Sequence, residues 1–456
     1  MDRQKELSEQ SIIKLLVKYS IPAIIGMLVN ALYNVVDRMF IGNIPGIGAL
    51  AITGVGITMP IITIILAFAL LISAGATASI SIKLGQGKRD EAEVILGNAV
   101  SLSVLIGFIL TILGIIFSGQ LLMLFGGSEN TIQYGITYIH IFLLGTTINL
   151  VGFALNHIMR ADGSPKMAAI VMVSGCLLNI VLDALFIFVL GMGIAGAAAA
   201  TIISQILTAI LGIIYFTKGK SHLKIKKQNL KITLPCIKPI LAIGSAPFMM
   251  QIAISLVQII TNNTLKATGE EIAIGAMTAI MSIMMLILMP LFGINQGAQP
   301  IIGYNYGAKN YQRSKKALLF SVLGGTIILI VGFIIIETMP NTLIRLFDGE
   351  GAMIDIAVPG LRIYASTMPI LAVSIVGSNY FQAIGKAGIA MFLSLLRQVI
   401  VLIPMLFMLS SVWGLTGVWL AQPVSDIICT GVIAGFLLKE FNTYKASTQS
   451  MELESV

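Results

Sequence analysis

The chain has 456 residues, of which 57% are hydrophobic and only 11% are charged, and its mean hydropathy is +0.96. This is more apolar surface than the core of a soluble domain can bury, which excludes an ordinary soluble protein. The net charge of +8 comes from Lys and Arg in short loops between apolar segments. We therefore attribute it to orientation in a membrane and expect no nucleic-acid partner.

Apolar segments of membrane-spanning length recur along the whole chain. A helix needs about 20 mostly apolar residues to cross a bilayer. The pattern predicts an all-α polytopic membrane protein with twelve transmembrane helices, at approximately 17–41, 50–82, 93–117, 135–158, 167–190, 194–217, 239–265, 272–304, 316–337, 358–383, 389–410 and 415–438.

The basic residues predict the orientation of these spans. With twelve spans, both termini lie on one side of the membrane, and the loops on that side carry most of the Lys and Arg. They are Lys83, Lys88, Arg89, Arg160, Lys166, Lys218, Lys220, Lys224, Lys226, Lys227, Lys231, Lys238, Lys309, Arg313, Lys315 and Lys316. The opposite side has only Arg38, Lys266, Arg345 and Arg362 near it. The positive-inside rule therefore predicts that both termini are cytoplasmic.

The two halves of the sequence repeat each other. "ISAGATASISIKLGQGK" (72–88) aligns with "INQGAQPIIGYNYGAK" (294–309), and "RADGSPKMA" (160–168) aligns with "QAIGKAGIA" (382–390) at nearly the same offset. Because each half has an even number of spans, the halves are parallel repeats around a central cavity, an arrangement common in alternating-access transporters. We predict an N-lobe (1–217), a basic cytoplasmic linker (218–238), a C-lobe (239–440) and a tail (441–456).

The first span contains an acidic residue, Asp37. Asn30, Asn34 and Asp37 follow helical spacing and share one face. A carboxylate in hydrocarbon costs at least ~2.5 kcal/mol, so Asp37 should face a polar cavity. Alternatively, it pairs with Arg38 at the outer interface. Pro22 removes a backbone donor and permits this helix to bend.

Further polar residues lie in the fifth and sixth spans. Asn179 and Asp183 of "CLLNIVLDALFIF" are four residues apart, and Thr201 lies in "GIAGAAAATIISQ". Together with Asp37 they form an all-oxygen set that suits Na⁺, or a proton held between two carboxylates. Asn179 and Thr201 could instead make only interhelical hydrogen bonds.

The second half lacks this arrangement. Asn262 aligns with Asp37, while Ile400 and Pro404 align with Asn179 and Asp183, so we predict that ion coupling resides in the N-lobe. Arg397 and Asp426 are interpreted as a buried or interfacial pair and not as a second ion site.

Substrate recognition leaves a weaker pattern. Candidate cavity residues are Asn30, Asn34 and Asn156, together with Met281 and Met285, because flexible thioethers can repack around ligands of different shape. The alternative is that these methionines face lipid or fill gaps between helices.

Sequence features of enzymes are scarce. There is no Walker A loop, and the three histidines show no metal-ligand spacing, so we predict no catalytic site and no cofactor. A membrane enzyme acting on lipid intermediates would need clustered His, Asp or Glu at the membrane face, where the loops offer mainly basic residues. A flippase for a lipid-linked or polysaccharide precursor is a second alternative, although the spans contain almost no Lys or Arg to bind such a substrate.

Several segments, in this order and spacing, resemble the multidrug and toxic compound extrusion (MATE) family. They are "IPAIIGMLVNALYNVVDRMFIG", "MRADGSPK", "NIVLDALFIF" and "GIAGAAAAT", and the resemblance extends over residues 10 to 440. The pattern is similar to the bacterial DinF-like branch, which includes MepA-type pumps. It implies a V-shaped pair of lobes that exports cationic, often aromatic, drugs in exchange for inward Na⁺ or H⁺.

By the same resemblance, Asp37, Asn179, Asp183 and Thr201 match N-lobe cation-binding positions, Asn156 matches a cavity-lining position, and Pro22 matches a helix bend. The leading hypothesis is a cation-coupled multidrug antiporter of the bacterial cytoplasmic membrane. Its expected partners are small organic cations and membrane lipids, and we expect a monomer.

Overall fold

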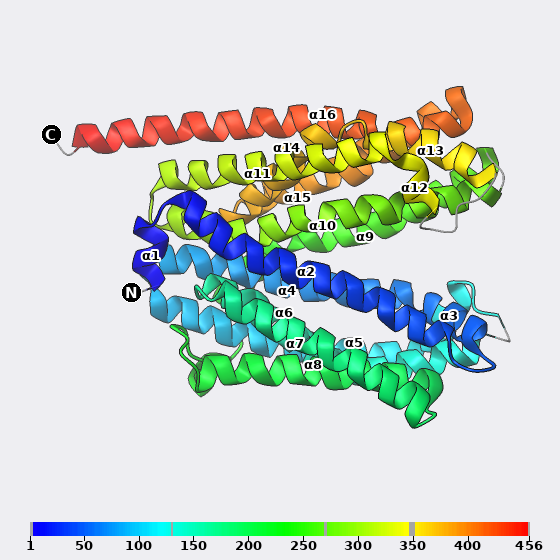
Figure 1. The fold of residues 1–456 in the computed structure, drawn as a ribbon. Helices are drawn as coiled ribbons and strands as arrows, with labels where there is room; N and C mark the ends of the chain where they lie inside the picture. Colours follow the sequence, from blue (N-terminus) through cyan, green and yellow to red (C-terminus); the bar gives the residue numbers. More distant parts are fainter. Residues whose placement is uncertain (1–2, 129–130, 269–270, 346–351, 455–456) are drawn as a thin grey trace.

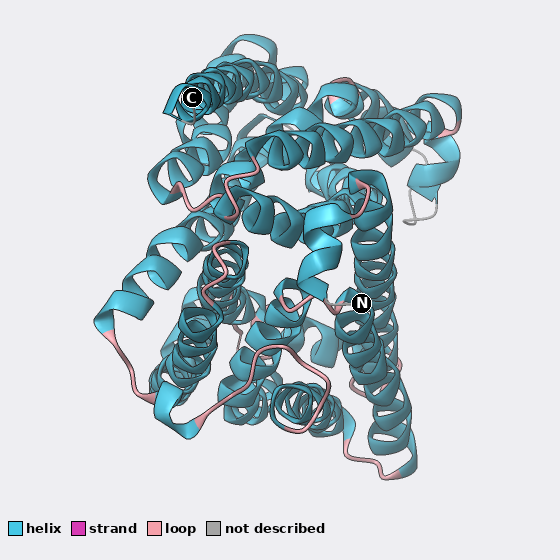
Figure 2. Ribbon diagram, turned by 90° about the vertical axis from the view of Figure 1, so that its left-hand side faces the viewer, coloured by secondary structure: helices cyan, strands magenta, loops and turns pink. Residues whose placement is uncertain are grey.

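A computed structural model describes residues 3–128, 131–268, 271–345 and 352–454. Every regular element over these residues is a helix, and the two ends of the chain lie at the same end of the bundle (Figure 1). We call this the terminal end and the opposite one the far end. Figure 2 views the helices from the terminal end, nearly along their axes.

The first half of the chain forms one group of helices. They are α1 (Arg3–Glu9), α2 (Ile12–Gly42), α3 (Gly48–Gly56), α4 (Met59–Gly85), α5 (Arg89–Leu124), α6 (Ile132–Ala161), α7 (Pro165–Ala184), the π-helical turn η1 (Leu185–Val189) and α8 (Gly193–Thr217). Apart from the short α1, this group is the N-lobe.

The second half forms the C-lobe, which lies beside the N-lobe in Figure 1. After the 3-10 turn η2 (Lys227–Leu230) come α9 (Leu234–Thr268), α10 (Glu271–Gly307), α11 (Tyr311–Thr338), α12 (Pro340–Arg345), α13 (Ala352–Ala365), α14 (Met368–Ala383), α15 (Ala387–Leu395), the π-helical turn η3 (Leu396–Val401) and α16 (Leu402–Glu454).

The helices match the predicted spans, with three local differences. Ten helices are long and apolar enough to cross a membrane, and the pair α13 and α14, bent by 54°, makes an eleventh span. α16 breaks at Gly414, whose φ of 54° and ψ of −130° suit only glycine. One of the ten is the continuous stretch Ala387–Tyr444, which joins α15, η3 and α16, and dividing it at Gly414 gives the predicted twelve spans over the described residues. The predicted second span is divided between α3 and α4, and the predicted tenth is bent.

The side chains explain why the helices are stable in a bilayer. In hydrocarbon every backbone polar group must be satisfied internally, which a helix achieves. On α5, Phe108 and Ile116 are exposed, while Gly107 lies on the inner side, where an added Cβ would come 2.6 Å from Thr147 Cα. The apolar exterior faces lipid and the small residues allow close helix packing.

A seam of glycines joins the two lobes. The glycine seam consists of Gly75, Gly85, Gly244, Gly293, Gly297 and Gly307. A Cβ on Gly244 would come 1.7 Å from Leu71 O, and a Cβ on Gly85 would come 2.0 Å from Tyr304 O. These glycines lie in the parts of α4, α9 and α10 nearer the terminal end. Glycines nearer the far end, such as Gly54 and Gly360, approach only their own lobe. The lobes therefore meet most closely at the terminal end.

The basic loop between the lobes is fastened to the N-lobe. Glu93 of α5, only 1% exposed, forms an ion pair with Lys226 and accepts a hydrogen bond from Lys224 N at 3.3 Å. Asn98 donates to Asn229 O at 3.3 Å and accepts from Thr233 N at 2.8 Å. The structure places the backbone of this predicted linker against α5. The reason is that its carbonyl and N–H groups find partners on that helix.

The short helix α1 bridges the lobes at the terminal end. Glu6 forms an ion pair with Lys18 of α2, while Arg313 of α11 donates to Gln10 O at 2.7 Å and Leu7 O at 3.1 Å. Asn305 of α10 accepts from Arg313 Nε at 3.0 Å. A guanidinium placed at the carbonyl end of a helix also interacts favourably with the helix dipole.

Arg313→Ala is expected to loosen α1. Hydrogen bonds to charged groups contribute about 1.5–3 kcal/mol each, so limited proteolysis of residues 3–10 should speed up roughly tenfold or more. Lys316→Ala, an exposed change on the same helix, is the control and should cleave at the wild-type rate. Equal cleavage of wild type and Arg313→Ala would show that Arg313 does not hold α1.

Candidate functional site

The structure brings together the four residues predicted for cation binding. Asp37 lies in the last third of α2, Asn179 and Asp183 lie in α7, and Thr201 lies in α8. All four are buried, with exposures of 8%, 2%, 0% and 5% respectively. They lie within the N-lobe, in the parts of α2 and α7 nearer the far end.

Asn179 connects the members of the site. With its carboxamide nitrogen facing Asp183, Asn179 donates to Asp183 Oδ2 at 2.8 Å and its oxygen accepts from Thr201 N at 3.2 Å. Thr201 Oγ1 donates to Ala197 O at 3.1 Å within α8. Asn179 thus fixes the Asp183 carboxylate to α8.

The carboxyl groups of Asp37 and Asp183, which we call the acid pair, adjoin each other within hydrogen-bonding reach. Asp37 Oδ1 and Asp183 Oδ1 are buried, and the described residues offer neither of them a hydrogen-bond partner. Arg38 is exposed, lies near Met59 Sδ at 4.0 Å and forms no ion pair with Asp37 in the described part of the chain. The alternative of an Asp37–Arg38 pair is therefore not what the structure shows. Two adjoining acids without a basic partner leave room for a free cation.

Two tyrosines beside the acid pair were missed from the sequence. Tyr33 of α2 and Tyr138 of α6 lie close enough to interact electrostatically with both carboxyl groups, and Tyr138 also interacts with the Thr201 side chain. Tyr33 is four residues before Asp37, so its helical spacing could have indicated it. Tyr138 comes from a helix with no local signal of this kind. Both tyrosines therefore belong to the electrostatic surroundings of the acids.

The backbone changes at this site. One residue after Asp183, at Ala184, the α7 helix ends, and the π-helical turn η1 follows. Single π-helical turns often lie at functional sites, because the wider turn reorients neighbouring side chains.

The predicted substrate-cavity residues are not brought together. Asn30 is half-buried, Asn34 is exposed and donates to Asn30 O at 2.6 Å, and Asn156 donates to Ala168 O at 2.7 Å, which fastens α6 to α7. Met285 is 58% exposed. Pro22 lies inside α2, which continues through it as one helix.

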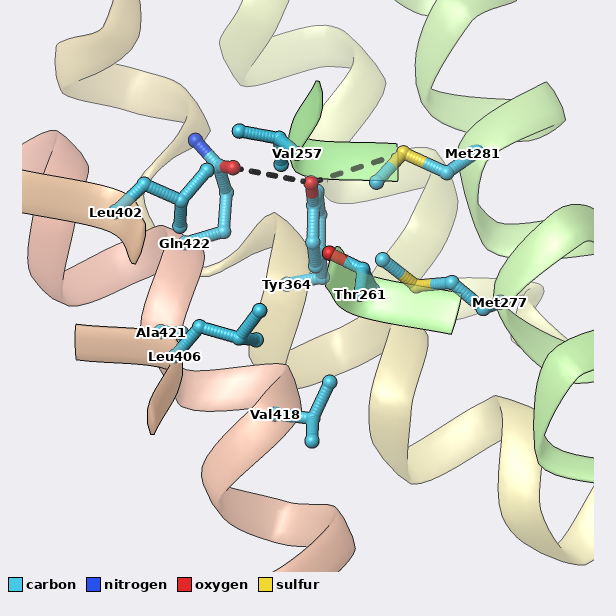
Figure 3. A pocket seen from close by; sticks show the side chains of 10 residues that line it. All are labelled: Val257, Thr261, Met277, Met281, Tyr364, Leu402, Leu406, Val418, Ala421 and Gln422. Carbon is cyan, nitrogen blue, oxygen red and sulfur yellow. Dashed lines mark hydrogen bonds between the residues drawn. The ribbon is translucent and has the colours of Figure 1, made fainter. Parts of the chain in front are cut away.

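Met281 instead lines a small pocket in the C-lobe (Figure 3). Its walls are aliphatic chains of α9 and α16, together with Thr261, Met277, Tyr364 and Gln422. Its volume of about 20 Å³ is room for roughly one water molecule. Tyr364 donates to Gln422 Oε1 at 3.2 Å across it. The pocket is too small for a drug in this conformation.

The chemistry of the acid pair suits a hard cation. The ligands are carboxylate, amide and hydroxyl oxygens, which prefer Na⁺ or a proton over soft metals. Among the described residues there is no group of three His, Cys, Asp or Glu side chains that could hold a metal ion. A monovalent ion that enters and leaves fits this site better than a permanently bound metal.

Comparison with known proteins gives the family. The MatE family model matches residues 22–185 and 247–408, once in each half of the chain. The chain is 26% identical over 421 residues to "Multidrug export protein MepA" of Staphylococcus haemolyticus (strain JCSC1435), covering 92% of both chains. It is 25% identical over 449 residues to the protein of that name from Staphylococcus aureus (strain bovine RF122 / ET3-1), covering 98% of both.

The fold is that of solved MATE structures. One is described as the outward-facing conformation of a multidrug resistance MATE family transporter of the MOP superfamily; it has a TM-score of 0.91 at 24% identity and covers 97% of this chain and 98% of its own. Another is described as MATE in the bent conformation. It has a TM-score of 0.92 at 24% identity, and the match covers 98% of this chain and 99% of that chain. The predicted two-lobe fold and the predicted family are both confirmed. The chain is a multi-pass membrane protein of the MatE family, whose members are transporters and not enzymes.

Proposed function

We propose that the protein is a multidrug antiporter that exports organic cations in exchange for H⁺ or Na⁺. The observation that carries this proposal is the acid pair: two buried carboxyl groups in one lobe, with unpartnered oxygens and no basic residue bound to them. The relatives named as multidrug export proteins support the drug as substrate class. The protein then works as a monomer in the bacterial cytoplasmic membrane, surrounded by lipid.

Exchange follows from the charge of the acid pair. Two negative charges in a medium of low dielectric are unfavourable unless a positive charge compensates them. An organic cation and a coupling ion compensate the same carboxylates, so binding of one favours release of the other. Antiport requires that the lobes expose this site to one side of the membrane at a time.

The lobes in this structure correspond to one step of that cycle. The excess of Lys and Arg near the terminal end supports a cytoplasmic location of both termini by the positive-inside rule. The glycine seam joins the lobes at this end. In this proposal the structure is closed toward the cytoplasm, and the acid pair, nearer the far end, exchanges with the outside.

The test uses purified protein in liposomes, and ethidium starts at equal concentration inside and outside. Uptake of ethidium is measured while a Na⁺ gradient or a pH gradient is imposed alone. We expect one of the two gradients to drive ethidium against its concentration gradient. Transport that responds to neither gradient would overturn ion coupling. Scrambling of a labelled lipid without ethidium movement would instead support the flippase.

A further inference from the structure

The C-lobe also contains a buried carboxylate, but this one is fully partnered. Asp426 of α16 is 2% exposed, and Arg397 Nε lies 2.9 Å from its Oδ1. Gln422 Nε2 donates to the same oxygen at 3.0 Å, and Thr367 Oγ1 donates to Asp426 Oδ2 at 3.4 Å. Both oxygens of Asp426 are therefore satisfied, whereas each member of the acid pair keeps a bare oxygen.

Arg397 lies in a π-helical turn that is fastened to the helix of Asp426. Asp183 lies two residues before the π-helical turn η1, whereas Arg397 lies within η3, a π-helical turn that aligns with residues 175–180 of α7 and not with η1. Ser425 Oγ donates to Arg397 O at 3.0 Å, which ties η3 to α16 next to Asp426. The Arg397 guanidinium is therefore held next to the Asp426 carboxylate by the backbone as well as by its side chain.

The side chains around Asp426 carry oxygen atoms of the types that hard cations bind. Besides the two carboxylate oxygens they include Gln422 Oε1 and the Thr367 and Tyr364 hydroxyls, and all three side chains are less than a tenth exposed. The pocket of Figure 3 lies against Tyr364 and Gln422 and has room for roughly one water molecule. The set matches the carboxylates, amide and hydroxyl of the N-lobe in type.

We propose that the Arg397 guanidinium is a resident cation in a C-lobe cation site, and that it restricts free-ion binding to the acid pair of the N-lobe. The inference rests on the proposed ion coupling for its role in transport. A charge that is covalently held cannot be exchanged, so the C-lobe takes no ion during the cycle. Arg397 then sets how many ions move per drug molecule. Without it, Asp426 would take one monovalent cation, either H⁺ or Na⁺.

The groups that face Asp426 indicate that removal of Arg397 would leave one negative charge to be compensated. The titratable and charged groups near it are Arg397 of η3, Tyr364 of α13 and Cys429 on α16 itself. Arg397 is the one basic residue among them. Removing its charge leaves one carboxylate with no fixed counter-charge in a buried position.

Arg397→Gln tests the proposal, because glutamine keeps hydrogen-bonding capacity without the charge. The matched control is Arg397→Gln/Asp426→Asn, which removes both charges. Purified proteins are titrated with ²²Na⁺ at fixed pH and, separately, with acid at zero Na⁺. Compared with wild type, we expect Arg397→Gln to bind one additional cation per protein and the double variant to bind none in addition. A folded Arg397→Gln protein with the wild-type number of bound ions would overturn the proposal.

Thermal unfolding provides a second measurement. A ligand that binds only the folded protein raises its melting temperature, so that of Arg397→Gln should rise with Na⁺ concentration or acid more steeply than that of the double variant. If Arg397→Gln stays unfolded at every Na⁺ concentration and pH while the double variant folds, a free cation cannot replace the guanidinium, and the proposal is wrong.

The same titrations in an Asp37→Asn/Asp183→Asn background separate this inference from the proposed function. There the acid pair is gone, and the additional cation of Arg397→Gln should persist. Wild-type protein that binds no ion would count against the proposed function alone, since the gain at Asp426 would still be measured.

Discussion

Asp183→Asn is expected to abolish ion-driven drug extrusion. Asp183 is completely buried, adjoins Asp37 and is held to α8 through Asn179. Within the described structure no basic side chain pairs with it, so an incoming cation has to compensate its charge. Asparagine keeps the shape of the side chain but removes the charge for which drug and ion compete. In everted membrane vesicles, ethidium extrusion driven by either gradient should fall to the level of vesicles that lack the protein.

Asp355→Asn, which changes an exposed carboxylate of α13, is the matched control and should extrude ethidium at the wild-type rate. The melting temperature of Asp183→Asn should not fall, because a buried neutral amide is less unfavourable than a buried uncompensated charge. If Asp183→Asn and Asp37→Asn both extrude ethidium at the wild-type rate, the acid pair has no part in the mechanism.

Gly244→Ala is expected to open the glycine seam. The added methyl would come 1.7 Å from Leu71 O and 2.6 Å from Leu71 C, and backbone atoms of a helix cannot move aside singly. Overpacking of this kind costs about 1–3 kcal/mol, so the population closed at the terminal end should fall roughly five- to a hundredfold relative to the open one. The measured quantity is the rate at which a cysteine at position 240, introduced as Ile240→Cys, is alkylated. Ile240 is fully buried at the seam, so this rate should rise when the seam opens. The three native cysteines are first replaced by serine.

Gly435→Ala is the control for this experiment, because no atom lies within 4 Å of the position of the added methyl. It should leave the alkylation rate of Ile240→Cys unchanged. If Gly244→Ala is alkylated as slowly as the control, then α4 and α9 tolerate a side chain at the seam and the close approach does not hold the lobes together.

Much of the fold could be predicted because its signals are local in sequence. Apolar length predicts a span, and the aligned glycines near 75 and 297 indicate the duplication. The breaks between α3 and α4 and at Gly414 were harder to predict, since a glycine in an apolar run is equally compatible with close helix packing. The family model matches each half separately, in agreement with the duplication.

The candidate site could be predicted only in part. Helical spacing places Asn179 and Asp183 on one face, but nothing local shows that α2 brings Asp37 to them. We grouped Asp37 with them as buried polar residues of the same half, and the resemblance to a family supported that grouping. Tyr138 reaches the site from α6, and Asn34, which shares the spacing of Asp37, points outward. Contacts between helices depend on how they pack in three dimensions, and spacing along one helix does not contain that information.

The attachment of the interlobe loop has a consequence for where the molecule hinges. Because Asn98 holds Asn229 and Thr233, the polypeptide that links the lobes travels with α5 as far as Thr233. Any rotation of one lobe against the other must therefore be absorbed within a short stretch that follows, at the start of α9. Pro239 lies there, and it lacks the amide hydrogen that would bond to the preceding turn and stiffen this part of the helix. The hinge segment between the lobes is thus only a few residues long, although the loop between them is much longer.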